Sequence, residues 1–332
     1  MKLLRKRKEY GILAIIVILA IIISIVNPAF LKISNIFDFL RSNSVYGIMA
    51  FGMLLVLITA GIDLTCSSTI VLCAVIQGKL MQANPTTNIF IILIVVIAVG
   101  GVIGLINGIL ITKIKIPPIV ATLGVQTITN ASVLFFTKGQ WISDLPQWYK
   151  NFGNFTIFTM PSENTTTGIY TQVLILIAAG ILTWFILNKL LIGRGIYAVG
   201  GNIQSAQRVG YKVDRILIFV YIYSGIMAGL ASVASVSIVG SVDPNTFTGY
   251  EMDVIAITVL GGASLAGGIG TVFGTSLGIV LMAVIKNGLL LMHISGYWQK
   301  AIMGAIILIT IAIDAISQAR ERDQAIKVDV AE

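Results

Sequence analysis

Apolar stretches of about twenty residues recur along almost the whole chain, and this pattern leaves it few ways to fold. A transmembrane helix needs roughly 20 consecutive apolar residues to cross the hydrocarbon core of a bilayer. Of the 332 residues, 57% are hydrophobic and only 11% are charged, whereas a soluble domain carries about 25% charged residues. The alternating segments typical of a membrane β-barrel do not occur in the sequence. The pattern therefore predicts an all-α, polytopic transmembrane helical bundle that forms one membrane-spanning domain over residues 1–332.

About ten spans are expected from these stretches. They are 11–27, 44–61, 64–82, 89–112, 117–137, 171–191, 216–240, 252–267, 271–292 and 298–314. The eighth is short and rich in glycine, so it is either a full crossing or a re-entrant segment.

The distribution of basic residues predicts which side of the membrane each loop faces. The N-terminal "MKLLRKRKEY" is basic, and no small-residue cleavage site follows the first apolar run, so we expect an uncleaved helix with a cytoplasmic N-terminus. Counting crossings from there makes residues 138–170 an extracytoplasmic loop and residues 315–332 a cytoplasmic tail. Most of the 22 Lys and Arg residues then lie on the cytoplasmic side, as the positive-inside rule requires. Both termini are therefore predicted to be cytoplasmic, in the inner membrane of a prokaryote.

Residues 192–215 form a polar, basic cytoplasmic loop, with "GRGIYAVGGNIQSAQRVGYKVDR" starting at residue 193. Asn202 is a good N-cap and Gly210 a good helix stop, which predicts a helix of about two turns between them. Ile203, Ala206 and Val209 recur every three residues and would give this helix one small apolar face. Two interpretations remain open: a surface connector, or a helix that fits a groove of another protein.

Polar residues inside apolar spans are candidates for a solute pathway, because embedding them is costly. They are Asp63, Asn107, Thr122, Glu251 and Asn287. Asp63 either caps a broken helix or lines a wet path, and Glu251 and Asp253 suit the N-terminus of a helix. The two asparagines suit hydrogen bonds to neighbouring helices equally well, and Lys286 is expected to snorkel towards a membrane surface. Asn107-Gly108 and Asn287-Gly288, each late in a glycine-bearing helix, hint at an internal repeat.

Several kinds of chemistry find no support in the sequence. Gly268 stands where a phosphate-binding loop needs lysine, so no nucleotide motif is formed. His293 is the single histidine, which argues against a catalytic triad, a metal site or a membrane enzyme. Cys66 and Cys73 suit two small core residues better than a disulfide or a metal pair. No cofactor is expected, and the net charge of +8 is not a nucleic-acid signal by itself, because its placement follows the membrane.

The predicted extracytoplasmic loop holds Trp141, Trp148, Tyr149 and Phe152. These aromatic residues suit either a belt at the membrane interface or a docking surface for a soluble partner.

Four segments of the chain resemble the ribose-type sugar permeases of ATP-binding cassette (ABC) importers. They are "GIDLT", "IPPIVATLG", the basic loop quoted above and "GYEMDVIAITVLGGASLAGGIGTVFGT", in this order between about residues 40 and 314. Cys66 and Ser67 replace the residues usual in the family after the first motif, which leaves the detail of that turn open. "GQWISDLP" is more similar to the rhamnose and autoinducer-2 branch than to the ribose branch.

The resemblance implies a transport subunit without enzymatic activity. Two permease copies, identical or different, would form the pathway, with a solute-binding protein outside and separate ABC ATPase subunits inside. It implies an ATPase-docking site in the basic loop, formed by Arg194, Tyr197, Gly200, Gly201, Asn202, Ser205, Ala206, Arg208 and Gly210. The expected solute is a monosaccharide or a related polyol-like molecule. The alternatives are autoinducer-2, a branched-chain amino acid, and a secondary transporter driven by an ion gradient.

Overall fold

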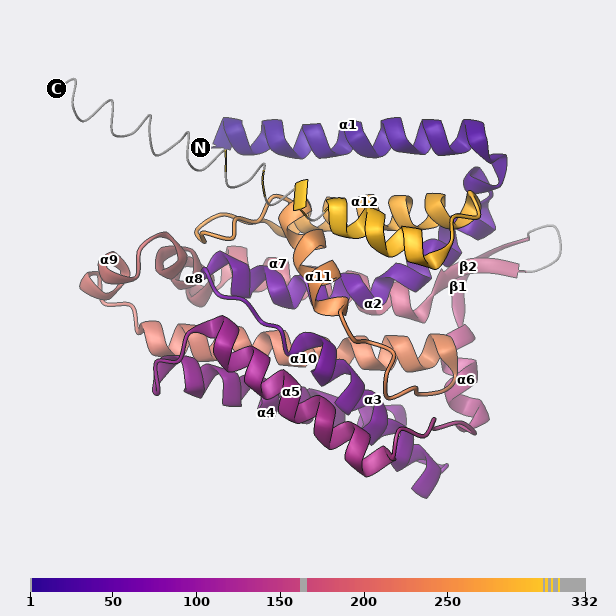
Figure 1. Cartoon of the computed structure of the whole chain (residues 1–332), viewed down its shortest axis with the longest axis horizontal. Coiled ribbons are helices and arrows are strands. Elements are labelled where there is room, and N and C mark those ends of the chain that lie inside the picture. Colours follow the sequence, from indigo (N-terminus) through magenta and orange to yellow (C-terminus); the bar gives the residue numbers. More distant parts are fainter. Residues whose placement is uncertain (1, 162–165, 307, 310–311, 313–315, 317–332) are drawn as a thin grey trace.

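The computed structural model describes all residues except 1, 162–165, 307, 310–311, 313–315 and 317–332. The described chain is almost entirely helical, with one short hairpin (Figure 1). In chain order the elements are α1 (Lys2–Val26), the 3-10 helix η1 (Pro28–Leu31), α2 (Ile33–Ile58), α3 (Cys66–Ala83), α4 (Ile89–Thr112), α5 (Pro118–Thr137), α6 (Gln147–Asn154), β1 (Thr156–Pro161), β2 (Thr166–Tyr170), α7 (Thr171–Lys189), α8 (Leu191–Gly201), α9 (Ile203–Arg208), α10 (Val213–Val239), α11 (Tyr250–Leu260) and α12 (Val272–Leu291).

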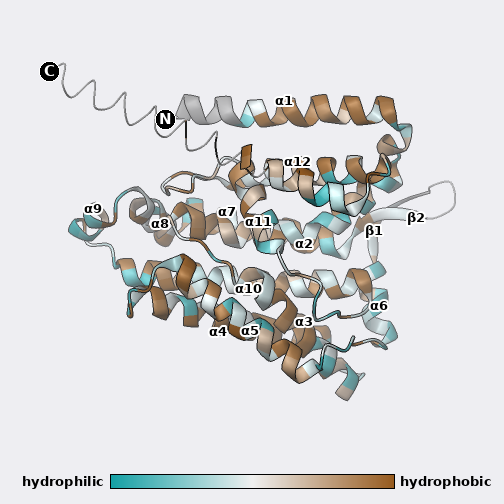
Figure 2. Cartoon of the chain, viewed as in Figure 1, coloured by the Kyte–Doolittle hydropathy of each residue, from teal (hydrophilic) through white to brown (hydrophobic). Residues whose placement is uncertain are grey.

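The expected spans are largely confirmed. Among the described residues, eight helices are long and apolar enough to cross a membrane, by length and composition. Figure 2 shows hydrophobic residues along these helices and hydrophilic ones gathered near α9 and α6. The span predicted at 89–112 matches α4 at both ends, whereas α2 begins at Ile33, eleven residues before the prediction. Of the tenth span, residues 298–306 are helical, and 307, 310–311 and 313–314 lie outside the described residues.

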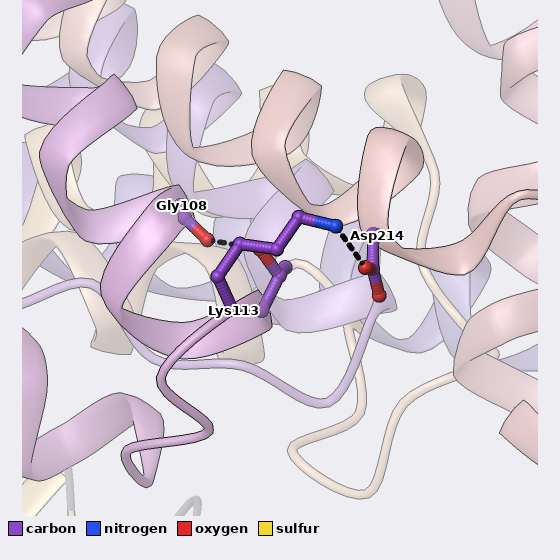
Figure 3. Close-up of polar contacts among 4 residues, drawn as sticks. Gly108, Lys113 and Asp214 are labelled. Atoms are coloured by element: carbon purple, nitrogen blue, oxygen red, sulfur yellow. Dashed lines mark hydrogen bonds and ion pairs between the residues drawn. The ribbon is translucent and has the colours of Figure 1, made fainter.

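Loops predicted to be cytoplasmic meet at one end of the bundle, here called the α9 end. Lys113 Nζ at the end of α4 lies 2.6 Å from Asp214 Oδ2 at the start of α10 (Figure 3). Thr271, just before α12, donates a hydrogen bond of 3.1 Å to Glu9 Oε1 in α1. The first contact joins segments 113–116 and 192–215, and the second joins segments 1–10 and 268–271. Gly200 lies against Gly268, which brings the two pairs of segments to the same end of the bundle.

Loops predicted to be extracytoplasmic meet at the opposite end, the hairpin end, where β1 and β2 lie (Figure 1). Ile142 and Val242 form an isolated antiparallel bridge, with N···O distances of 2.9 Å in both directions. Asn27 Nδ2 donates to the Leu291 carbonyl at 3.0 Å, which joins the end of α1 to the end of α12.

The aromatic side chains of loop 138–170 mostly attach this loop to the bundle. Tyr149 on α6 is fully buried and its hydroxyl donates to Gln77 Oε1 on α3 at 3.0 Å. Trp148 Nε1 donates to the Pro85 carbonyl at 2.8 Å. Of the four aromatic residues singled out in the sequence, Trp141 alone is largely exposed, at 64%. The loop is thus anchored by its aromatic residues, and neither interpretation from the sequence accounts for Tyr149.

Close glycine contacts fix the direction in which the central helices run. Gly100 and Gly104 on α4 approach the backbone of Gly225 and Tyr221 on α10 so closely that a Cβ at either glycine would overlap a carbonyl oxygen. The numbers rise on α4 while they fall on α10, so the two helices are antiparallel. Small residues permit such close backbone contact between membrane helices.

The same argument makes α2 and α12 antiparallel. Gly47 on α2 lies against Ile279, whereas Ile58 at the other end of α2 lies against Gly270. Gly52 packs on Ser224 and Met227 of α10, and Gly61, beyond the end of α2, lies against Tyr221. Therefore α2 and α4 run one way and α10 and α12 the other. Inverted repeats require such opposite directions, and the stretches α2–α4 and α10–α12, in which α4 and α12 carry the Asn-Gly dipeptides, are here called the two repeats.

Each repeat contains a helix that begins inside the bundle. The chain turns back after Ile58 through residues 59–65 before α3 begins, and after Val239 through residues 240–249 before α11 begins. The eighth predicted span is wrong as one continuous helix, because α11 ends at Leu260 and its 11 residues extend only about 16 Å. Residues 261–271 lead to α12 without regular helix, and glycines with positive φ occur among them at 262, 267 and 268. Because Val242 lies at the hairpin end and Gly268 at the α9 end, the segment crosses the bundle as an irregular stretch followed by a half-length helix, and it is not re-entrant.

Candidate functional site

The basic loop folds into two consecutive short helices at the α9 end. Asn202 ends α8 and caps α9, with its side-chain oxygen accepting from the Ser205 amide at 2.8 Å. Gly210 has a φ of 91°, the left-handed conformation that glycine adopts at helix stops. The predicted cap and stop are both confirmed, and α9 is a short helix of six residues.

The predicted apolar face of this helix is only partly available to a partner. Ile203 is 46% exposed and Val209 is 79% exposed, but Ala206 is 4% exposed and packs into the core of its own chain. The prediction that Ala206 contacts an ATPase therefore needs correction. The small side chain of Ala206 lets α9 pack closely on the bundle. After α9 the chain turns back, and the Tyr211 amide donates to the Ala206 carbonyl at 3.0 Å.

The other predicted docking residues divide into two groups. Six are exposed: Arg194, Gly201, Asn202, Ser205, Arg208 and Gly210. The remaining two, Tyr197 and Gly200, are half-buried on α8 and turn towards the bundle.

Contacts of α8 join it to the helix breaks of both repeats. The Tyr197 hydroxyl donates to the Gly270 carbonyl at 2.8 Å. Gly200 lies against Ile58, and a Cβ there would overlap the Ile58 carbonyl oxygen. That oxygen also accepts from the Gly268 amide at 2.8 Å. A displacement of α8 would therefore push on the end of α2 and on the segment that follows α11.

Asp63 is the centre of a buried hydrogen-bond network at the break between α2 and α3. Its Oδ1 accepts from the Thr65 amide at 2.9 Å and from the Thr65 hydroxyl, and its Oδ2 accepts from the Ser224 hydroxyl at 2.7 Å. Asn107 Nδ2 on α4 donates to Thr65 Oγ1 at 2.8 Å. Asp63 is 1% exposed and Asn107 is fully buried. Asp63 thus holds the turn that precedes α3 and links it to α10.

The structure brings only part of the predicted pathway set together. Thr122 donates to the Pro118 carbonyl at 2.8 Å and lies 3.4 Å from the Ile62 carbonyl, so it touches the Asp63 turn. Asn287 is elsewhere, in a pair of 2.9 Å amide hydrogen bonds with Asn35. Glu251 is buried in the first turn of α11, with Oε2 free of any hydrogen-bond partner within the described part of the chain. The alternative that the asparagines hydrogen-bond neighbouring helices holds for Asn287, whose partner Asn35 lies on α2, whereas Asn107 bonds to Thr65 in the turn before α3.

Lys286 does not snorkel, contrary to the expectation from the sequence. Its Nζ pairs with Asp253 Oδ2 at 2.8 Å and lies 3.5 Å from the ring centroid of Tyr46. The side chains are 23% and 20% exposed. The position of Asp253 at the start of a helix was a recognisable signal, but no local pattern pointed to its cation, because the pair joins residues 33 positions apart. Tyr46 also stacks on Tyr250, with ring centroids 5.0 Å apart.

Comparison with known proteins gives the family. Residues 35–311 match the family described as the branched-chain amino acid transport system / permease component. The chain belongs to this family. It is a multi-pass inner-membrane transport subunit of bacteria and not an enzyme.

Curated relatives that match over most of their length include sugar permeases. The chain is 32% identical to the ribose import permease RbsC of Escherichia coli K12 over 92% of its length and 93% of the relative. It is 36% identical to RbsC of Bacillus subtilis 168, over 90% and 89%, respectively. It is 32% identical to the galactose/methyl galactoside import permease MglC of Salmonella typhimurium, over 95% and 96%. The comparison with solved structures gave no match.

Proposed function

We propose that this chain is the translocation subunit of an ABC importer for a monosaccharide or a related polyol. Separate ATPase subunits would dock at the α9 end, a solute-binding protein would deliver the solute at the hairpin end, and a second permease copy would complete the pathway. Relatives whose names specify ribose and galactose import support the solute class. The sequence carries no nucleotide motif, so the energy would have to come from another chain.

The charges at the α9 end support its assignment to the cytoplasm. Loops that meet there include the basic N-terminal "MKLLRKRKEY" and the segment that carries Arg194, Arg208 and Lys212. Cytoplasmic loops carry an excess of Lys and Arg. The ion pair of Lys113 with Asp214 at this end is largely exposed, at 60% and 48%, and contributes little to stability.

The docking proposal rests on one observation. The capped, exposed helix α9 directly follows α8, and α8 contacts the helix breaks of both repeats. A partner that moves α9 would move α8, and Gly200 and Tyr197 would pass the displacement to the end of α2 and the segment after α11. The exposed Ile203 and Val209 side chains offer an apolar contact for a groove on the ATPase. Ala206 would not touch the ATPase itself but would hold α9 against the core of its own chain.

The proposed solute pathway runs past the two helix breaks. Asp63, Asn107 and Thr122 would shape it at the α3 break, and Glu251 at the α11 break. Asn287 would act from further away, through α12.

A matched pair of substitutions tests the docking site. Ile203→Glu and Gln204→Glu each place one acid in the first turn of α9, where a negative charge stabilises the helix. Only Ile203 belongs to the apolar contact, so we expect Ile203→Glu to lower ATPase co-purification at least tenfold, about 1.4 kcal/mol. Gln204→Glu should retain co-purification near wild type. If the two variants co-purify with the ATPase to the same extent, and both insert at normal levels, the proposed docking surface is wrong.

A further inference from the structure

The turn between α2 and α3 is enclosed by polar side chains from two neighbouring helices. Asp63 in this turn accepts hydrogen bonds from Thr65 and, at 2.7 Å, from Ser224 on α10. From the other helix, α4, Asn107 donates to the Thr65 hydroxyl at 2.8 Å. The turn is therefore held by hydrogen bonds to α4 and to α10 at the same place.

Tyr221 on α10 brings one more polar group to this turn. It precedes Ser224 by three residues and so shares its face of the helix. The Tyr221 hydroxyl oxygen lies 2.5 Å from the position that a Cβ on Gly61 would take, so the absence of a side chain there leaves room for the hydroxyl. The Tyr221 backbone lies against Gly104, one turn before Asn107 on α4. Tyr221 and Asn107 thus approach the turn from adjacent helices.

Two atoms around the turn lack a hydrogen-bond partner within the described part of the chain: the Tyr221 hydroxyl and Asn107 Oδ1. Tyr221 is 1% exposed and Asn107 is fully buried. Buried polar atoms are nearly always hydrogen-bonded, and leaving one unpaired is costly. The two atoms are complementary, because a phenol O–H donates whereas an amide oxygen only accepts.

We propose that the turn between α2 and α3 is a binding site for one hydroxyl oxygen, supplied by a water molecule or by a hydroxyl of the transported solute. This oxygen accepts a hydrogen bond from the Tyr221 hydroxyl and donates one to Asn107 Oδ1. An ammonium group has no acceptor for the Tyr221 proton, and a carboxylate has no donor for Asn107, so a neutral hydroxyl group fits best. The solute as source rests on the proposed function, whereas water as source does not.

Thermal unfolding of the purified permease, without sugar, tests the site for water. Tyr221→Phe removes only the hydroxyl, and Tyr223→Phe on the same helix is the matched control, because its hydroxyl is paired with that of Thr183 at 2.7 Å. A bound water predicts that Tyr221→Phe lowers the melting temperature about as much as Tyr223→Phe does. A hydroxyl that bonds to nothing would leave the melting temperature unchanged or higher, since the substitution then removes an unpaired buried group.

Uptake into vesicles that contain the ATPase and the binding protein tests the site for the solute. A bound solute hydroxyl predicts that Tyr221→Phe raises KM for the transported sugar about 3- to 10-fold, while Tyr223→Phe leaves KM unchanged. A lower melting temperature with an unchanged KM assigns the oxygen to water. If Tyr221→Phe changes neither quantity, the site is wrong.

Failure of the proposed function can be told apart from failure of the site. Wild-type vesicles that transport neither D-ribose nor D-galactose contradict the proposed function, and the melting temperature of Tyr221→Phe then decides the site alone. In that case a lowered melting temperature supports a bound water, and an unchanged or raised one overturns the site.

Gly61→Ala tests where the Tyr221 hydroxyl lies. The new Cβ would displace this hydroxyl, so we expect the substitution to lower the melting temperature in the wild-type background and to lower it less in the Tyr221→Phe background. Equal losses in the two backgrounds would mean that the hydroxyl does not lie against the turn, and would also overturn the site.

Discussion

Adjacent glycines at the end of α8 allow a sharp test of how the docking segment is joined to the bundle. At Gly200 a Cβ would overlap the Ile58 carbonyl oxygen and come within 2.7 Å of the Gly268 amide nitrogen. These are backbone atoms that cannot rotate away. At Gly201, one residue later, a Cβ would meet nothing within 4 Å. The two positions therefore differ in packing and share the same helix.

The substitution Gly200→Ala must displace α8 from the end of α2. Overpacking costs about 1–3 kcal/mol, and weakening the hydrogen bond from Gly268 to Ile58 adds about 1 kcal/mol. The expected loss is about 2–4 kcal/mol of unfolding free energy. Gly201→Ala should be neutral or stabilising by up to about 1 kcal/mol, because alanine favours a helix more than glycine does.

Thermal unfolding in detergent, together with uptake and ATP hydrolysis in vesicles, measures both effects. We expect Gly200→Ala to lower the melting temperature and to reduce uptake per ATP hydrolysed, while Gly201→Ala keeps at least the wild-type melting temperature. A Gly200→Ala protein as stable and as well coupled as Gly201→Ala would refute the contact between α8 and the end of α2.

Two further predictions concern buried polar contacts. Lys286→Met should cost about 1–2 kcal/mol of unfolding free energy, because its ion pair is mostly buried. Lys113→Met breaks an exposed ion pair and should cost less than about 1 kcal/mol. Equal losses for the two variants in chemical denaturation would contradict the difference in burial between the two pairs. Ser224→Ala should cost about 1–3 kcal/mol because it removes a donor from the buried Asp63 carboxylate. Ser276→Ala, which loses only a hydrogen bond to its own helix, should cost less than about 1 kcal/mol, and a reversed order of the two serine variants would contradict the role of Asp63.

The spans were predictable because the bilayer imposes a length and an apolar composition on each of them. The span at 89–112 was predicted to the residue, and the N-cap Asn202 followed from local chemistry alone. The eighth span failed because hydropathy continues past Leu260, while the glycines that follow end the helix. A hydropathy average over a window of residues does not detect such a break in a helix.

Contacts between distant segments were beyond the reach of the sequence. The pairing of Lys286 with Asp253 depends on how α11 lies against α12, and no local pattern encodes it. Ala206 was placed on an exposed face by its spacing, but α9 turns this residue into the core of its own chain, where it is 4% exposed. For the site, Asp63 and Glu251 were recognisable as costly embedded acids. Thr65 and Ser224, which bond to Asp63, were not recognisable, because a hydroxyl in an apolar stretch is ordinary until its partners are known.

ATP-driven sugar uptake tests the central claim most directly. The permease is reconstituted into vesicles with the ATPase inside and the binding protein outside, and D-ribose and D-galactose uptake is followed. The proposed function predicts that uptake of one of these sugars requires both partners and internal ATP, and continues when a protonophore and a sodium ionophore collapse the ion gradients. Uptake that stops on gradient collapse while ATP is maintained, or that proceeds without the ATPase, would contradict it.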